Sequence, residues 1–148
     1  MIFISHRGNI NNQEPSYENN PNYILEAINL GYQCEIDVWR LENSWMLGHD
    51  EPQYQVGENF LLTKELWCHA KNLGALEGLL KLGTHCFWHQ EDDYTITSKG
   101  IIWAYPGKKL IESAICVMPE RQTGNLRLEV KCAGICSDFI EKYRKEND

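Results

Sequence analysis

The sequence predicts an α/β fold in which a mainly parallel sheet forms a reduced or degenerate (β/α) TIM-type barrel with several helices missing. In the first half of the chain, short apolar runs alternate with helix-forming segments, which is typical of a parallel sheet. Polar residues also gather where successive apolar runs end, as they do at the mouth of such barrels. The chain has 148 residues, whereas a regular barrel of this type takes about 250. The second half therefore has too few residues for a full set of helices.

The chain begins with a strand followed by a loop and a helix. The apolar run MIFIS at residues 1–5 predicts a buried strand. A polar, Asn-rich stretch follows, and Asn20 is a suitable N-cap for a helix that has Pro21 at its first position. Gly31 ends this helix.

Two strands and a helix complete the regular part of the pattern. Residues 34–41 and 44–50 each predict a strand, and a polar turn joins them. Residues 66–72 predict the next strand. A helix over residues 73–82 follows, because leucines recur there at helical spacing and Gly83 then stops it.

The second half predicts short strands with little helix between them. Residues 84–90 form a strand-like run, and residues 92–107 predict a hairpin that turns at Ser98-Lys99-Gly100. Two further short buried strands are expected at residues 114–119 and 134–138. Asp138 is a suitable cap for a last amphipathic helix.

Composition narrows the classes of partner. The formal net charge of −7 argues against nucleic acid, because phosphate neutralisation needs clustered Lys and Arg. No run of about 18 apolar residues occurs and no signal peptide precedes His6, so we expect a cytoplasmic protein without stable membrane insertion. The six cysteines form no CxxC pair and mostly lie in apolar runs, which favours buried free thiols. Exposed sheet edges would favour a homo-oligomer.

Two carboxylates on one predicted strand give the first indication of a site. Glu35 and Asp37 are two residues apart, so both side chains emerge on one face of the strand. That face could instead lie in water on a half-exposed strand. The histidines favour a site, because His6, His49 and His69 each come at or near the end of a predicted strand.

The residue types suggest the cleavage of a phosphodiester. Paired carboxylates are hard oxygen ligands, suited to Mg²⁺ or Ca²⁺. Two histidines can act as general acid and general base near neutral pH. Arg7 and Lys71 could hold an anion such as phosphate.

At these residues the sequence resembles the glycerophosphodiester phosphodiesterase family, within the phospholipase C-like phosphodiesterases. The order and approximate spacing of the motifs match the family pattern, and they span residues 4–139. The matching motifs are ISHRGN (4–9), SYENN (16–20), CEIDVW (34–39), LGHDEP (47–52) and GICSDF (134–139).

The resemblance implies one phospholipase C-like phosphodiesterase barrel domain over residues 1–148 and a role for each matching residue. It implies that one histidine of a catalytic pair deprotonates an internal hydroxyl, which attacks phosphorus, while the other protonates the leaving alkoxide. The sequence does not assign these two roles between the histidines. The implied residues are His6 and His49 as the catalytic pair, Arg7 and Lys71 at the phosphate, Glu18 and Asn19 lining the pocket, and Glu35 and Asp37 at the metal.

The chain departs from the family pattern at the third metal ligand. The family has an ExK-like strand there, whereas this chain has HAK, so His69 stands in place of the acid. An imidazole shifts the preference from Mg²⁺ or Ca²⁺ toward Mn²⁺, Zn²⁺ or Fe²⁺. Mg²⁺ or Ca²⁺ is the expected divalent cation and Mn²⁺ an alternative. The third ligand could also be Glu120 or be absent.

These features predict a metal-dependent phosphodiester hydrolase acting on a small-molecule phosphodiester. Two alternatives stay open: a non-catalytic relative that binds a phosphoester, and a phosphodiesterase or lyase acting on a nucleotide-sugar or polyol phosphate. For the latter, Trp103 and Tyr105 could stack on a ring, although strand aromatics are more often core. His89 could face the site, whereas His85 is expected to be structural.

Overall fold

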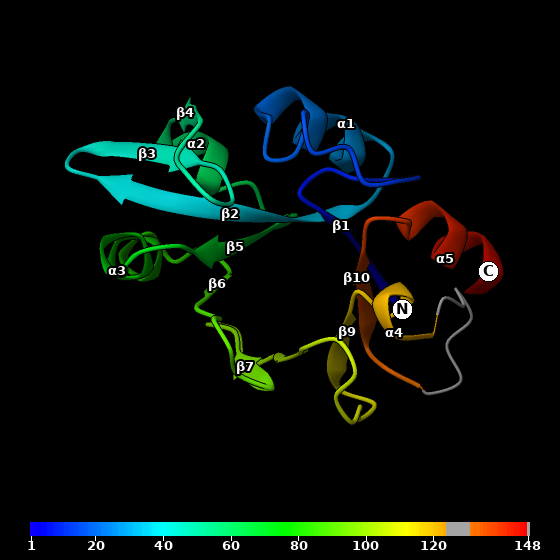
Figure 1. Cartoon of the computed structure of the whole chain (residues 1–148). Helices are drawn as coiled ribbons and strands as arrows, with labels where there is room; N and C mark the ends of the chain where they lie inside the picture. The colour runs from blue at the N-terminus through cyan, green and yellow to red at the C-terminus, as the bar shows by residue number, and fades with distance from the viewer. Residues whose placement is uncertain (124–130, 148) are drawn as a thin grey trace.

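The computed structural model describes residues 1–123 and 131–147, and in this part of the chain ten strands form one curled, mixed sheet that carries five short helices (Figure 1). The strands are β1 (Ile2–His6), β2 (Gln33–Leu41), β3 (Ser44–Leu47), β4 (Tyr54–Val56), β5 (Leu66–Ala70), β6 (Cys86–Phe87), β7 (Tyr94–Ile96), β8 (Ile102–Ala104), β9 (Ala114–Val117) and β10 (Gly134–Ser137). The helices are α1 (Pro21–Asn29), α2 (Glu58–Leu61), α3 (Leu73–Leu82), α4 (Glu120–Thr123) and α5 (Ile140–Asn147).

The central strands of the sheet each run parallel to their neighbours, in the order β6-β5-β2-β1-β10-β9-β8. Antiparallel strands extend it: β3 pairs with β2, β4 with β3, and β7 with β8. Figure 1 shows that the sheet curls into a half-barrel, so that β2 and β5 lie across the molecule from β9.

The prediction of a reduced (β/α) TIM-type barrel is wrong. The structure is a sheet-dominated half-barrel, and the pairing order of its described strands leaves β6 and β8 unpaired with each other. The connections explain this result. The chain from β6 to β8 contains the β7 hairpin strand, and the nine residues from β8 to β9 contain no helix. A crossover that returns a parallel strand with its helix needs about 10–12 residues or more.

Most of the locally predicted elements are confirmed. The capped helix after Asn20 is α1, and the Asn20 side chain accepts a hydrogen bond from the Asn22 backbone N–H. The helix at residues 73–82 is α3, with Asn72 as its N-cap and Gly83 in the left-handed conformation at its end. The hairpin of β7 and β8 also forms as predicted.

The predicted strand over residues 44–50 is shorter and runs the other way. It is β3, antiparallel to β2, so it belongs to a hairpin rather than to the parallel series. Because Val38 pairs with Leu47, the hairpin returns the chain to the level of Asp37, where the Gly48 backbone N–H donates to the Asp37 carbonyl. This hairpin places His49 beside the carboxyl end of the parallel strands.

Successive side chains of β2 point alternately into the hydrophobic core and toward the predicted site. Cys34, Ile36 and Val38 are fully buried and belong to a hydrophobic cluster that includes residues of α1 and α3. Glu35 and Asp37 emerge on the opposite face, as the period of two requires. A second cluster, which includes Ile4, Trp67 and Trp103, joins strands from both sides of the half-barrel.

Within the described residues, no helix is both long and apolar enough to cross a membrane.

Candidate active site

Strand register brings the predicted site residues together. His6 at the end of β1 pairs with Glu35 on β2, and Asp37 on β2 pairs with His69 on β5. All three strands are parallel, so their carboxyl ends meet at one edge of the sheet. In open α/β sheets, ligands bind in the crevice at that edge.

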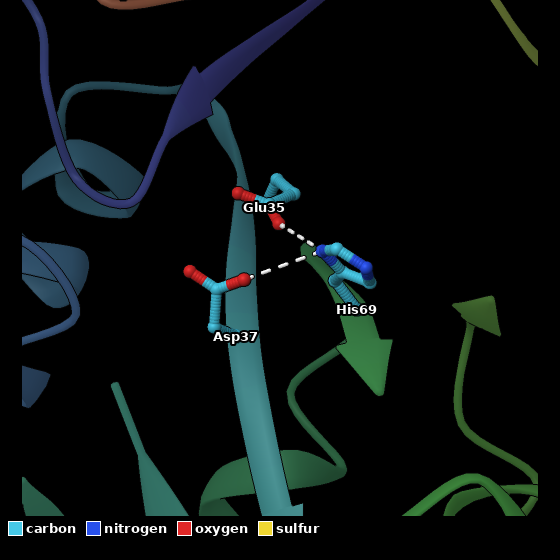
Figure 2. Close-up of side chains that lie close together, drawn as sticks. All are labelled: Glu35, Asp37 and His69. Carbon is cyan, nitrogen blue, oxygen red and sulfur yellow. Dashed lines mark ion pairs between the residues drawn. The ribbon is translucent and has the colours of Figure 1, made fainter. Parts of the chain in front are cut away.

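Glu35, Asp37 and His69 form a compact cluster of possible metal ligands. One donor atom from each lies within 4.8 Å of the other two (Figure 2). His69 Nδ1 is 3.2 Å from Asp37 Oδ1 and 3.6 Å from Glu35 Oε1. On the other side of its ring, His69 Nε2 donates to the His89 carbonyl oxygen at 2.8 Å. This hydrogen bond fixes a proton on Nε2, so Nδ1 is the nitrogen that faces the two carboxylates.

A proton and a cation compete for His69 Nδ1. Burial alone would lower the pKa of His69, but hydrogen bonds to Asp37 and Glu35 and their negative charges outweigh burial and raise it to about 9. Near neutral pH, the side chain is therefore an imidazolium that satisfies the two carboxylates. A divalent cation bound there would replace this proton, because a ligating imidazole is neutral.

Asp37 is the most constrained residue of the cluster. Its side chain is fully buried, and Arg7 Nε lies 2.9 Å from Oδ2 while Lys71 Nζ lies 3.7 Å from Oδ1. Burial would raise the pKa of Asp37, but the hydrogen bond from His69 and the charges of Arg7 and Lys71 lower it well below its usual range. The Asn19 side chain also donates to Oδ2 and accepts from the Asp37 backbone N–H, both at 2.9 Å.

Glu35 leaves one oxygen free for a ligand. Its side chain is 3% exposed, and Oε2 has no hydrogen-bond partner among the described residues. The nearby His6 Nε2 lies at 3.9 Å, too far for a hydrogen bond. A buried carboxylate oxygen without a partner is costly. Two carboxylates and an imidazole at this separation fit a divalent cation, with the nitrogen donor favouring Mn²⁺, Zn²⁺ or Fe²⁺ over Ca²⁺.

His6 is held in one orientation by Asp138, for which the sequence predicted a helix cap and no contact with a histidine. Asp138 Oδ1, which follows β10, lies 2.7 Å from His6 Nδ1 and also accepts a hydrogen bond from Asn9 at 2.8 Å. Burial would raise the pKa of Asp138, but the hydrogen bond and charge of His6 outweigh it and lower the pKa. An ionised Asp138 holds the proton of His6 on Nδ1, which leaves Nε2 free to face the cleft.

Arg7 is fixed by carboxylates on two of its nitrogens. Besides Asp37 at Nε, the Glu18 carboxylate accepts from Nη1 at 3.0 Å. Glu18 also accepts from Asn9 at 2.9 Å, which connects the Arg7 and His6 contacts into one network. Burial would lower the pKa of Arg7, but the surrounding carboxylates raise it, so the guanidinium stays charged.

The turn after β1 requires its glycine. Gly8 has φ +97°, and a Cβ there would collide with the ring of Tyr23. Arg7 also takes a left-handed conformation, with φ +56°, which is uncommon for a residue with a side chain. This strained turn aims Arg7 at the cleft.

His49 differs from His6 because it lies at the surface. The residue is exposed, and Nδ1 lies 2.8 Å from the carboxylate of Asp50, whose side chain is 93% exposed. Gly48 allows this turn, since a Cβ there would collide with the Glu51 carbonyl oxygen. His49 can therefore exchange protons with water directly.

A cleft with two hollows joins these residues. The first hollow has a volume of about 270 Å³. Its charged and histidine lining consists of His6, Arg7, Glu35, His49, His69 and Lys71. The rest of its lining consists of His89, Gln90, Trp103, Tyr105, Pro106, Val117, Met118 and Arg121. The second, about 550 Å³, is lined by polar residues that include Glu18 and Asn19. Every site residue that the sequence predicts lines one of the two hollows, except the metal-ligand candidate Asp37, which is fully buried behind them in contact with Arg7 and Lys71.

Two residues considered in the sequence, Glu120 and His85, do not line the first hollow. The Glu120 carboxylate accepts hydrogen bonds from the Ser137 and Tyr143 hydroxyls, so it faces β10 and α5. His85 is buried with Nε2 2.8 Å from the Thr97 hydroxyl, as expected for a structural histidine. Arg121, which had no role in the sequence analysis, lines both hollows.

Searches of protein-family models, curated proteins and solved structures each find no match to this chain. Functional inference for this protein therefore depends on its motifs and on the geometry of the cleft.

Proposed function

We propose that this protein is a metal-dependent phosphodiester hydrolase in which His6 and His49 act as general base and general acid. The observation that carries the proposal is the cleft at the carboxyl ends of β1, β2 and β5. It brings two histidines, two positively charged side chains and a cluster of possible metal ligands to one hollow. These are His6 and His49, Arg7 and Lys71, and Glu35, Asp37 and His69.

A divalent cation held by Glu35, Asp37 and His69 would withdraw charge from a phosphate oxygen and so make phosphorus more electrophilic. Positively charged side chains of the protein would stabilise the same negative charge on the phosphate. Arg7 and Lys71 both line the hollow beside this cluster. Their positive charges would attract the diester and stabilise the extra negative charge that develops on phosphorus.

We assign the two histidine roles from their surroundings, since His6 is buried beside Asp138 whereas His49 is exposed. Because Asp138 holds the proton of His6 on Nδ1, Nε2 can accept a proton from a substrate hydroxyl. That hydroxyl oxygen then forms a bond to phosphorus, while the bond between phosphorus and the leaving alcohol breaks. His49, exposed and reprotonated by water, donates a proton to the leaving oxygen. In the second half of the reaction, His49 takes a proton from water, which attacks phosphorus of the cyclic phosphate. His6 returns its proton to the ring oxygen as the bond between that oxygen and phosphorus breaks.

The test is hydrolysis of a panel of glycerophosphodiesters in the presence of Mg²⁺, Ca²⁺ or Mn²⁺. We expect turnover by the wild type and a loss of about 10²- to 10⁴-fold in His6→Ala and in His49→Ala, which is the usual contribution of a general acid or base. His85→Gln is the matched control, because His85 is bonded to Thr97 and does not line the cleft. This variant should keep wild-type turnover.

A different outcome would indicate a binding protein. If the wild type turns over no substrate with any of the three cations, and phosphate-ester binding is the same in both alanine variants, the proposed hydrolase activity is wrong.

A further inference from the structure

The two walls of the first hollow differ in chemistry. One wall carries the charged residues of β1, β2 and β5, whereas the opposite wall carries the aromatic and apolar side chains of β8, β9 and the segments that follow them. Trp103 is only 3% exposed and packs against Trp67 and Phe87, with ring centroids 5.7 and 4.7 Å away. The floor of this wall is therefore rigid.

Tyr105 offers an aromatic surface above that floor. It is 41% exposed, and its ring centroid lies 4.9 Å from that of His89. It lines both hollows, together with Arg7, His49 and Arg121. An exposed aromatic ring beside a phosphate-binding region can stack on a planar group of the same ligand.

His89, which follows β6, adds unused hydrogen-bonding capacity beside Tyr105. Both of its ring nitrogens are buried without a partner among the described residues. A neutral imidazole has one donor and one acceptor, so polar atoms at the edge of a planar ligand could satisfy what the protein leaves unpaired.

The second hollow is suited to the other arm of a diester. Polar side chains dominate its lining, and it shares Arg7, His49, Tyr105 and Arg121 with the first hollow. Its residues besides the four shared ones include Gln13, Glu18, Asn19, Asp50, Glu51 and Gln53. A phosphate held by Arg7, which lines both hollows, would send one ester arm into each hollow.

We propose that the substrate is an unsymmetrical phosphodiester with a planar aromatic group on one alcohol, and that this group stacks on Tyr105 in the first hollow. The inference rests on the proposed function for the position of the phosphate. It goes further by naming the substrate class and a specificity residue on the wall opposite the charged cluster. An aryl ester and a nucleoside both present such a planar face to Tyr105, and the experiment below distinguishes them.

The experiment measures the dissociation constants of inorganic phosphate, phenyl phosphate and uridine 5′-monophosphate by calorimetry in the presence of Mg²⁺. We expect the ring-bearing ligands to bind about tenfold more tightly than inorganic phosphate. Tyr105→Ala should remove most of this advantage and leave the affinity for inorganic phosphate within about twofold of wild type, whereas Tyr105→Phe should keep the advantage.

Tyr94→Ala is the matched control. Tyr94 is similarly exposed and lies on the neighbouring strand β7, but it lines a different hollow with Ile96 and Ile102. It should bind all three ligands as the wild type does. A His89→Phe variant distinguishes an aryl group from a nucleoside base. If the polar edge of a base pairs with His89, this variant should weaken the binding of the nucleotide only.

Equal affinity of the wild type for all three ligands would overturn the inference, as would an equal loss for all three in Tyr105→Ala. These outcomes are separate from the hydrolysis test. A protein that cleaves glycerophosphodiesters without any ring preference is a hydrolase that lacks this specificity. One that binds rings through Tyr105 but cleaves no diester keeps the specificity and loses the proposed reaction.

Discussion

The wall of the cleft formed by β1, β2 and β5 is built differently from the wall formed by β8 and β9. On the first wall, hydrogen bonds and ion pairs connect His6, Arg7, Asp37 and their partners into one buried network. On the second wall, the side chains are mainly aromatic and apolar, and Tyr105 and Arg121 are exposed.

The difference follows from the cost of burying charge. A buried carboxylate or guanidinium is stable only when it is paired and hydrogen-bonded, so each charged group of the first wall brings a partner from a neighbouring strand or loop. An aromatic wall needs only packing. We therefore expect substitutions on the first wall to affect stability and chemistry together, and those on the second to affect ligand preference.

The largest effect on stability should come from Asn19→Ala. Asn19 makes both hydrogen bonds to Asp37 described above, and it takes a left-handed conformation with φ +62°, which Asn tolerates better than Ala. Its removal leaves buried polar groups of Asp37 without partners. We expect a loss of about 3 kcal/mol in the free energy of unfolding, measured by urea denaturation.

The neighbouring Asn20→Ala variant is the control. Asn20 caps α1 through one hydrogen bond and does not contact the network, so its loss should cost about 1 kcal/mol. Equal costs for the two variants would mean that Asn19 is a turn residue and nothing more.

The two walls also differ in how far the sequence predicts them. The spacing of Glu35 and Asp37 predicts their shared face correctly, because side-chain alternation is local to a strand. Asp138 has no such local pattern. Its place beside His6 depends on the parallel pairing of β1 with β10, strands more than 120 residues apart, and a strand end at GICSDF is the one signal that pointed there.

The global shape was less predictable for a related reason. Local patterns correctly predicted α1, α3 and the β7–β8 hairpin. They could not show whether the sheet closes, because closure depends on strand pairing between β6 and β8 rather than on either segment alone. The antiparallel direction of β3 could have been predicted, because only two residues separate it from β2 and a parallel connection needs about a dozen.

The next largest effect should be on catalysis, in Asp138→Asn. An amide cannot stabilise the protonated form of His6 and can reverse its tautomer, so we expect kcat to fall about 100-fold with KM nearly unchanged. Asp50→Asn is the matched variant at His49. Because Asp50 is 93% exposed, its pairing should be worth little, and kcat should fall by less than about fivefold.

Steady-state kinetics on the best diester of the panel gives both values. If kcat falls by a similar factor in Asp138→Asn and Asp50→Asn, the burial of His6 does not make it more dependent on its carboxylate than the exposed His49 is. A rise in KM without a change in kcat for Asp138→Asn would place Asp138 in substrate binding instead of in the positioning of His6.

The smallest effect concerns the junction between the two walls and depends on pH. His85, beside the start of β6, contacts Thr97 in the β7–β8 turn, and its ring lies tilted against Trp67 with the ring centroids 4.0 Å apart. Burial, with a smaller contribution from Lys99, lowers the pKa of His85 to about 4, whereas the unfolded chain has a pKa of about 6.5. The unfolded chain therefore binds more protons between these values, so stability from this group is present above about pH 6.5 and is lost as pH falls toward 4.

His85→Gln can keep a hydrogen bond to Thr97 but cannot take up the proton. Between about pH 7 and pH 4, the wild type should lose about 2 kcal/mol more unfolding free energy than this variant, measured by urea denaturation at each pH. Parallel pH profiles for the two proteins would show that folding does not lower the pKa of His85. A steeper wild-type profile would instead show that protonation of one buried imidazole loosens the contact that holds the aromatic wall against the charged one.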